Sequence, residues 1–155
     1  MLTIRNAVVE DASYLVPRLR EADREEIIAS GASDPLAAIQ AGFGPGRLTL
    51  TGVDELGYPV TMFGSGTHPH DPRVGVVWAV ASDGIKHHAK SFLGPSREWV
   101  EALNRRHPVL MNYTDCRNEE HHRWLKWCGF IFINKVTGPT GLPFFEFVRL
   151  RNNDV

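Results

Sequence analysis

The sequence has only two cysteines, Cys116 and Cys128, among its 155 residues. Two thiols do not make a disulfide framework, so we expect both to be reduced, as is usual inside a cell. No run of 18 uncharged apolar residues occurs, so no membrane-spanning helix is expected. Residues 1–12 include arginine and acidic residues where a signal peptide needs an unbroken apolar stretch. We therefore expect a cytoplasmic protein with no membrane partner.

An excess of charge of either sign is also missing. The 17 lysines and arginines nearly balance 18 aspartates and glutamates, which leaves a formal net charge of -1. Nucleic-acid binding usually shows as a basic stripe, so no nucleic-acid partner is expected. The 43% content of hydrophobic residues is typical of a globular core, and no repeat or linker divides the chain. The sequence therefore predicts one domain over residues 1–155.

Alternation and turn residues predict seven strands, at 2–7, 47–53, 59–64, 74–81, 109–113, 130–136 and 144–150. Asp11 is expected to cap a helix that Pro17 kinks and that ends near Gly31. Asp34 and Pro35 mark the start of a second, short helix. Between the strands at 74–81 and 109–113, a helical region is expected to break at 94–95, and Ser96 is expected to cap the helix that follows the break. A further helix is expected at 118–128.

The resulting order is β-α-α-β-β-β-α-β-α-β-β. A meander of three strands followed by β-α-β-α-β excludes simple doubly wound folds and all-β folds. The strand at 74–81 contains VGVVWAVA, nearly continuous apolar sequence, so it is expected in the centre of the sheet with both faces covered.

This order resembles the GNAT superfamily of N-acetyltransferases. Asn118, Lys126, Gly129 and Phe130 stand in the register of a GNAT helix-to-strand motif within NEEHHRWLKWCGF, and IRNAVVEDASYLVPRL is similar to the first strand and helix of many members. The resemblance implies an α/β (α+β) fold, with a mixed, mostly antiparallel central sheet of about 6–7 strands flanked by about four helices. It also implies transfer of an acetyl group from acetyl-CoA, as co-substrate, to a primary amine.

The resemblance further implies a CoA pyrophosphate site where the central strand turns into the next helix. Small residues there let backbone N–H groups approach the phosphates. This chain keeps one glycine in SDGIKHH, and Asp83 adds negative charge that Lys86 and the histidines could offset. Alternatively, Asp83 caps a plain strand-to-helix turn. The implied cofactor-binding residues are Val80, Ala81, Ser82, Gly84, Ile85, Lys86, His87, His88 and Asn118.

At the positions of the family's catalytic residues, this chain has other residue types. Leu125 stands where the family has its tyrosine acid, and Trp78 replaces a glutamate that often lies on the central strand. Tyr113 is the substitute acid, although it could equally be a core aromatic. His121 occupies a position that is usually a small alanine beside the cofactor.

Candidate bases for the amine are Asp83, His87, His121, His122 and Asp115, each of which could instead be an exposed polar residue. The catalytic candidates that we carry forward are His121, Asp115 and Tyr113.

The seven histidines include two adjacent pairs, which point about 100° apart on a helix and cannot chelate a metal alone. No metal is therefore expected. Cys116 beside Arg117 could be an activated nucleophile or an inert thiol. On the last helix, Trp124 is expected in the core, whereas Trp127 could make an exposed contact.

A narrower resemblance comes from LREADREEI, Trp78 and WLKWCGF. These segments look like phage-encoded GNAT-like proteins, some of which are internal virion proteins of short-tailed phages. Two hypotheses follow: an N-acyltransferase, with full or reduced activity, or a non-catalytic GNAT-fold protein that binds a host or virion protein. The second implies a place in the virion or the host cytoplasm.

Overall fold

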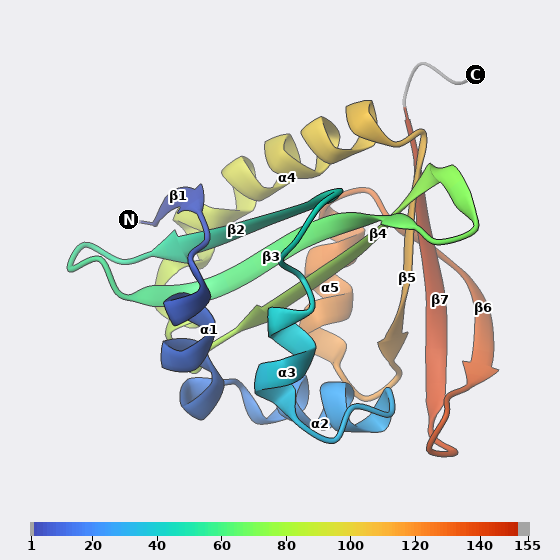
Figure 1. Cartoon of the computed structure of the whole chain (residues 1–155), viewed down its shortest axis with the longest axis horizontal. Coiled ribbons are helices and arrows are strands. Elements are labelled where there is room, and N and C mark those ends of the chain that lie inside the picture. Colours follow the sequence, from blue (N-terminus) through green and yellow to red (C-terminus); the bar gives the residue numbers. More distant parts are fainter. Residues whose placement is uncertain (1, 152–155) are drawn as a thin grey trace.

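A computed structural model describes residues 2–151, in which one seven-stranded sheet is flanked by five α-helices (Figure 1). The strand order is β1-β2-β3-β4-β5-β7-β6, and only β4 and β5 run parallel. The strands are β1 Thr3–Asn6, β2 Arg47–Val53, β3 Pro59–His68, β4 Asp71–Ala81, β5 Val109–Asp115, β6 Ile131–Thr137 and β7 Pro143–Leu150. The helices are α1 Val9–Leu15, α2 Glu21–Ala29, α3 Pro35–Gln40, α4 Ala89–Arg106 and α5 Glu119–Trp127, with 3-10 turns η1 Val16–Arg18 and η2 Asp83–His88.

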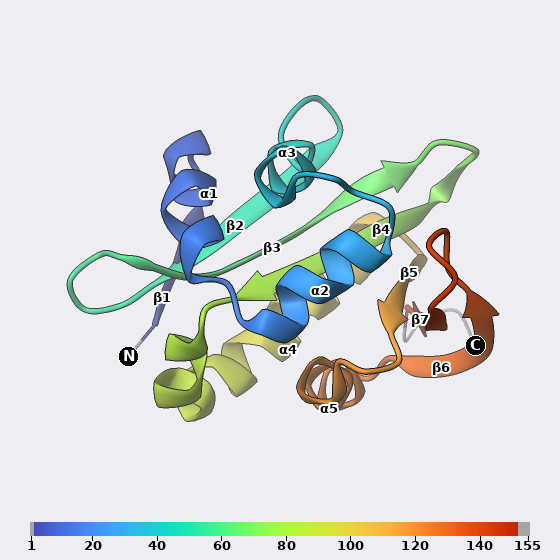
Figure 2. The same cartoon turned by 90° about the horizontal axis from the view of Figure 1, so that it is seen from below.

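The helices form a layer on each face of the sheet. Helices α1, α2 and α3 cover one face, while α4 and α5 cover the other (Figures 1 and 2). Alternation along β4 follows these layers: Val80 packs with Leu15 and Ile39, whereas Val77 packs with Val100 and Leu125. The predicted fold class and the central place of β4 are therefore confirmed.

The first helical region differs from the prediction. The residue before α1 is Val8, and Asp11 lies inside the helix, 4% exposed, where its carboxylate accepts from the Val8 N–H at 2.9 Å. The carboxylate also accepts two hydrogen bonds from Arg5, each 2.8 Å. Pro17 does more than kink a helix: it lies in η1, after which the chain becomes extended at Leu19 and restarts as α2. Asp34 does cap α3, by accepting from the Leu36 N–H.

The expected break at Gly94 and Pro95 is wrong, because α4 continues through both residues. A proline normally clashes with the Cβ of the preceding residue, and Gly94 has none. Ser96 is no cap: its hydroxyl donates to the Leu93 carbonyl. Phe92, Ser96, Val100 and Leu103 form one continuous buried face, so tertiary packing stabilises the helix. The expected long turn at 65–73 is also wrong, since β3 and β4 extend into a hairpin.

Two histidines lie inside the fold. His107 is 5% exposed, with its Nε2 3.2 Å from the Thr67 hydroxyl and its Nδ1 without a partner. His122 is 8% exposed, and its Nε2 lies 2.8 Å from the Asp115 carbonyl, so this nitrogen donates. Burial lowers the pKa of both rings below the ordinary value, because the charged form loses its solvation there.

Stability is therefore expected to fall as the pH drops from about 7.5 to about 5. The unfolded chain takes up protons on His107 and His122 near pH 6.5, before the folded chain does, so acid favours unfolding in this window. Each histidine contributes a slope of at most about 1.4 kcal/mol per pH unit. Urea unfolding at several pH values measures it. His107→Gln should flatten the slope, whereas His70→Gln, on the exposed hairpin, should not; a flat wild-type curve would refute the assignment.

Candidate functional site

The parallel strands β4 and β5 pair over only three residues each, 74–76 with 109–111. Beyond that point the strands separate, as expected for an opening beside the central strand. Asn112 spans the start of the gap by donating from Nδ2 to the Val77 carbonyl at 2.6 Å. The Ala81 N–H points into the gap and donates to Asp23 at 2.9 Å. By alternation, the peptide groups of Ala79 point into the gap as well.

Two cavities meet at this separation. The inner cavity, about 230 Å³, is lined by residues of α2, α3, α4, α5 and the sheet, and the outer cavity, about 580 Å³, lies between α4 and α5. Four residues line both: Ala79, Val80, His121 and Trp124. The two cavities therefore adjoin each other at the gap in the sheet.

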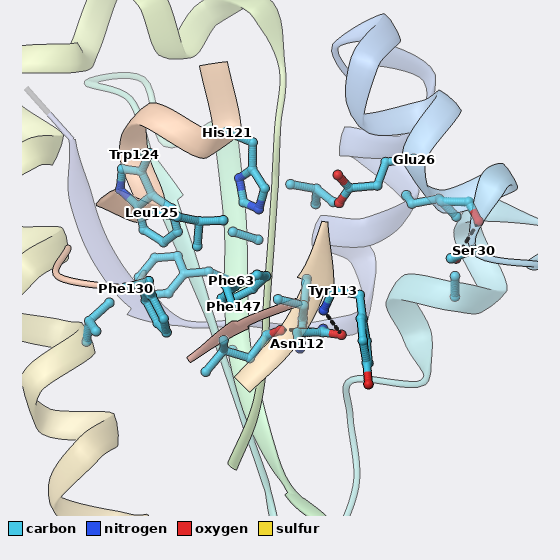
Figure 3. A pocket seen from close by; sticks show the side chains of 18 of the residues that line it. Glu26, Ser30, Phe63, Asn112, Tyr113, His121, Trp124, Leu125, Phe130 and Phe147 are labelled. Atoms are coloured by element: carbon cyan, nitrogen blue, oxygen red, sulfur yellow. Dashed lines mark hydrogen bonds between the residues drawn. The ribbon is translucent and has the colours of Figure 1, made fainter. Parts of the chain in front are cut away.

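The inner cavity is mostly apolar, with Phe63, Trp78 and Phe147 among its walls. Figure 3 shows the side chains of Glu26 and His121 pointing toward this space from α2 and α5. The Glu26 Oε1 accepts hydrogen bonds from the Thr114 hydroxyl and the Asp115 N–H, both at 2.8 Å, and from Asn118 at 3.3 Å.

The outer cavity combines an apolar floor with cations. Its floor includes Ile85, Phe92, Leu93, Trp124 and Trp127, and its charged lining residues are Arg20, Asp23, Lys86, Glu120 and Arg123. Lys86 is exposed, and its ammonium lies 3.9 Å from Glu120. Such a loose exposed pair can exchange for another anion.

A buried polar network lies at the end of β4, beside the gap. Asp23, 4% exposed, accepts from Arg20 at 3.0 Å, from Asn118 at 3.0 Å and from the Ala81 N–H. Arg20 also contacts Glu120 at 3.3 Å. The network thus joins α2, the end of β4 and the start of α5.

The implied cofactor-binding residues divide into two groups. Val80, Ala81, Ile85 and Lys86 line the outer cavity. Ser82, Gly84, His87, His88 and Asn118 are not among its lining residues. The turn that should carry the pyrophosphate is η2, in which the Ser82 N–H is already bonded to Val60 and the Ile85 N–H to Ser82. Asp83 is the first residue of η2, and neither it nor Ser82 makes a side-chain cap.

Of the three catalytic candidates, the structure brings only His121 to the meeting point of the cavities, where its ring stacks on Trp124 with centroids 5.8 Å apart. Tyr113 borders the inner cavity, but it is 44% exposed and its hydroxyl lies away from His121 and Glu26 in Figure 3. Asp115 is 1% exposed and lines neither cavity. Burial alone would raise the pKa of Asp115, but hydrogen bonds from Arg117 hold it below its ordinary value.

Glu26, Arg20 and Asp23 were missed by the sequence-based assignment. They lie in a charged stretch that has the composition of any solvated helix. Their partners Thr114 and Asn118 are about 90 residues away in the chain, so no spacing pattern connects them. The only signal is the order of elements, which brings the first helices near the ends of β4 and β5.

The remaining candidates lie elsewhere. His122 packs against Phe132 and Phe145 and lines neither cavity. Burial raises the pKa of the Cys116 thiol, and raises that of Cys128, 0% exposed, to about 11, so neither is an activated nucleophile. Trp127 is 42% exposed and carries Arg97 over its ring, 4.3 Å from the centroid.

Within residues 2–151, no three His, Cys, Asp or Glu side chains gather as a metal ion requires. In the same part of the chain, no helix has the length and apolar character needed to cross a bilayer.

No protein-family model matches the chain, and no curated protein matches its sequence. Its fold, however, matches solved structures. Aminoglycoside acetyltransferase AAC(6')-Ib in complex with coenzyme A matches with a TM-score of 0.69 at 19% identity, over 97% of this chain and 95% of that one. A putative phosphinothricin N-acetyltransferase gives 0.71 at 18% identity, over 99% and 100%. A GCN5-related N-acetyltransferase from Kribbella flavida gives 0.69 at 18%, over 96% and 97%. The chain therefore has the GNAT fold.

Proposed function

We propose that this protein transfers an acyl group from acyl-CoA to a primary amine. The observation that carries the proposal is the separation of β4 from β5, where two cavities share four lining residues. A thioester in the outer cavity and an amine in the inner cavity meet in this gap. Several solved neighbours hold CoA or acetyl-CoA, among them AAC(6')-Ib with kanamycin, which supports the same use of the fold here.

The outer cavity fits acyl-CoA. The peptide groups of Ala79 offer a strand edge to the amides of an extended arm. Phe92 and Leu93 give that arm an apolar floor, and Lys86 and Arg123 offer cations to phosphate groups. This arrangement relies on side-chain cations more than on the N–H cradle that the sequence resemblance implied.

Acyl-CoA would supply the thioester carbonyl. The amine nitrogen forms a bond to the carbonyl carbon while the carbon–sulfur bond breaks, so the nitrogen must lose protons and the sulfur must gain one. His121 lies at the junction where this exchange takes place. An imidazole has one ring nitrogen that can accept a proton and one that can donate a proton, which suits this position.

Titration calorimetry with acetyl-CoA and with CoA tests the proposal. We expect binding by the wild type, and Lys86→Glu should weaken it roughly tenfold or more because a phosphate contact becomes repulsive. Lys90→Glu is the matched control: Lys90 is exposed on α4 and lines neither cavity, so less than about a twofold change is expected. Absence of binding up to about millimolar, some 4 kcal/mol, contradicts the proposal.

The alternative is a non-catalytic protein that binds a host or virion protein, as the phage resemblance implies. Edge strand β6 supports it, because Ile131 and Ile133 are 59% and 47% exposed there. The same titration separates the two functions, since only the acyltransferase requires CoA.

A further inference from the structure

Glu26 lines the inner cavity, and one oxygen of its carboxylate is fixed by hydrogen bonds. Its Oε1 holds Thr114, the Asp115 N–H and Asn118, as described above. Among residues 2–151, no hydrogen bond or ion pair ends on Oε2. Three donors on one oxygen orient the carboxylate, so the other oxygen is held ready for a ligand without the entropy cost of ordering a mobile side chain.

The charge of the cavity is that of one anion. Of the described residues that line it, Glu26 alone carries a carboxylate, and none is a lysine or an arginine. A carboxylate facing apolar walls is best matched by one cation that donates a hydrogen bond to it. A second cationic group on the ligand would find no second carboxylate among the described residues that line the cavity.

The cavity is also small. Its volume of about 230 Å³ lies below the roughly 300–1,000 Å³ usual for drug-sized ligands. An apolar cavity of about 150 Å³ takes up benzene, so the inner cavity has room for one ring and a short aminoalkyl chain. Phe63, Trp78, Phe130 and Phe147 supply aromatic contacts for such a ring.

We propose that the acyl acceptor is a small, apolar monoamine whose ammonium group binds Glu26 Oε2 and whose apolar body fills the inner cavity. This rests on the proposed acyltransferase function and names its substrate class. Polycationic acceptors, such as the kanamycin bound by a solved neighbour, would leave further ammonium groups unpaired here.

Glu26 also accepts a proton during the reaction. The bound ammonium gives one proton to Oε2, and the neutral nitrogen then forms the carbon–nitrogen bond as the carbon–sulfur bond breaks. The second proton of the nitrogen passes to His121, and His121 gives a proton to the departing sulfur, so its ring ends in its starting state. The proton on Glu26 leaves to solvent, so the products are an amide, CoA and one proton.

The test compares wild type and Glu26→Gln, which keeps an oxygen for Thr114 and Asp115 but removes the charge. Thiol release is followed with acetyl-CoA and either phenethylamine or kanamycin. We expect the wild type to acetylate phenethylamine at least 100-fold better than kanamycin, and Glu26→Gln to lose at least 100-fold in kcat/KM with phenethylamine. Acetyl-CoA affinity should be unchanged in the variant. Glu21→Gln, exposed on the same helix, should act as the wild type.

A second measurement needs no variant. Phenethylamine should bind to the protein at least tenfold more tightly than phenethyl alcohol, which has the same apolar body without the charge. If the protein binds acetyl-CoA, any one of three results would overturn the acceptor assignment and leave the acyltransferase function intact. These are full activity of Glu26→Gln, a preference for kanamycin over phenethylamine, and equal affinities for the amine and the alcohol. Absence of acetyl-CoA binding would overturn both.

Discussion

Asp23→Ala is expected to lower the free energy of unfolding by about 3–5 kcal/mol, the usual result of removing one partner from a buried ion pair. The carboxylate satisfies Arg20, Asn118 and the Ala81 N–H at once. Without it, the Arg20 guanidinium stays buried with only the half-exposed Glu120 as a charged partner. The Ala81 N–H also loses its acceptor, so a donor is left unpaired at the floor of the gap.

Thermal unfolding by circular dichroism measures this loss, which corresponds to a fall in Tm of roughly 6–20 °C. Glu21→Ala is the control, because Glu21 shares the first turn of α2 but is exposed. It should change stability by no more than about 0.5 kcal/mol. Equal effects of the two substitutions would show that Asp23 acts only through its charge at the helix start and that the network contributes little.

Much of the fold could be predicted because its signals are local. The alternation of 47–53 predicted the bounds of β2, and Asp34 with Pro35 predicted the start of α3. These signals act between residues a few positions apart, where a side chain reaches its own backbone. The signal at Gly94 and Pro95 is local too, but the break that it predicted is wrong. The packing of a whole helix face outweighs the local preference there.

The site could be predicted only in part. The register of a family motif pointed to His121, and the place after the central strand pointed to Lys86; both residues line the outer cavity. Glu26 and Asp23 became visible only when the fold brought α2 to the ends of β4 and β5. A carboxylate acquires its role from the donors around it, and these donors come from distant parts of the chain.

Gly64→Ala is expected to lower the free energy of unfolding by about 3 kcal/mol, at the upper end for overpacked sites. A Cβ on Gly64 would lie 2.2 Å from the Leu48 carbonyl oxygen and 3.2 Å from the Thr49 Cα. Both atoms belong to the backbone of β2, so relief requires the paired strands β2 and β3 to move apart. Gly64 also lines the inner cavity, so this shift should weaken the proposed acylation of an amine as well as stability.

Gly66→Ala is the matched control, two residues further along β3 on the same face. Its Cβ would meet the Arg47 guanidinium nitrogen at 3.0 Å, the far end of a flexible, exposed side chain that can move aside. We expect less than about 1 kcal/mol from this substitution. Urea unfolding of both variants compares the two. A loss at Gly66 as large as that at Gly64 would mean that the sheet rejects any added methyl group here, and that close approach of the β2 backbone is not the cause.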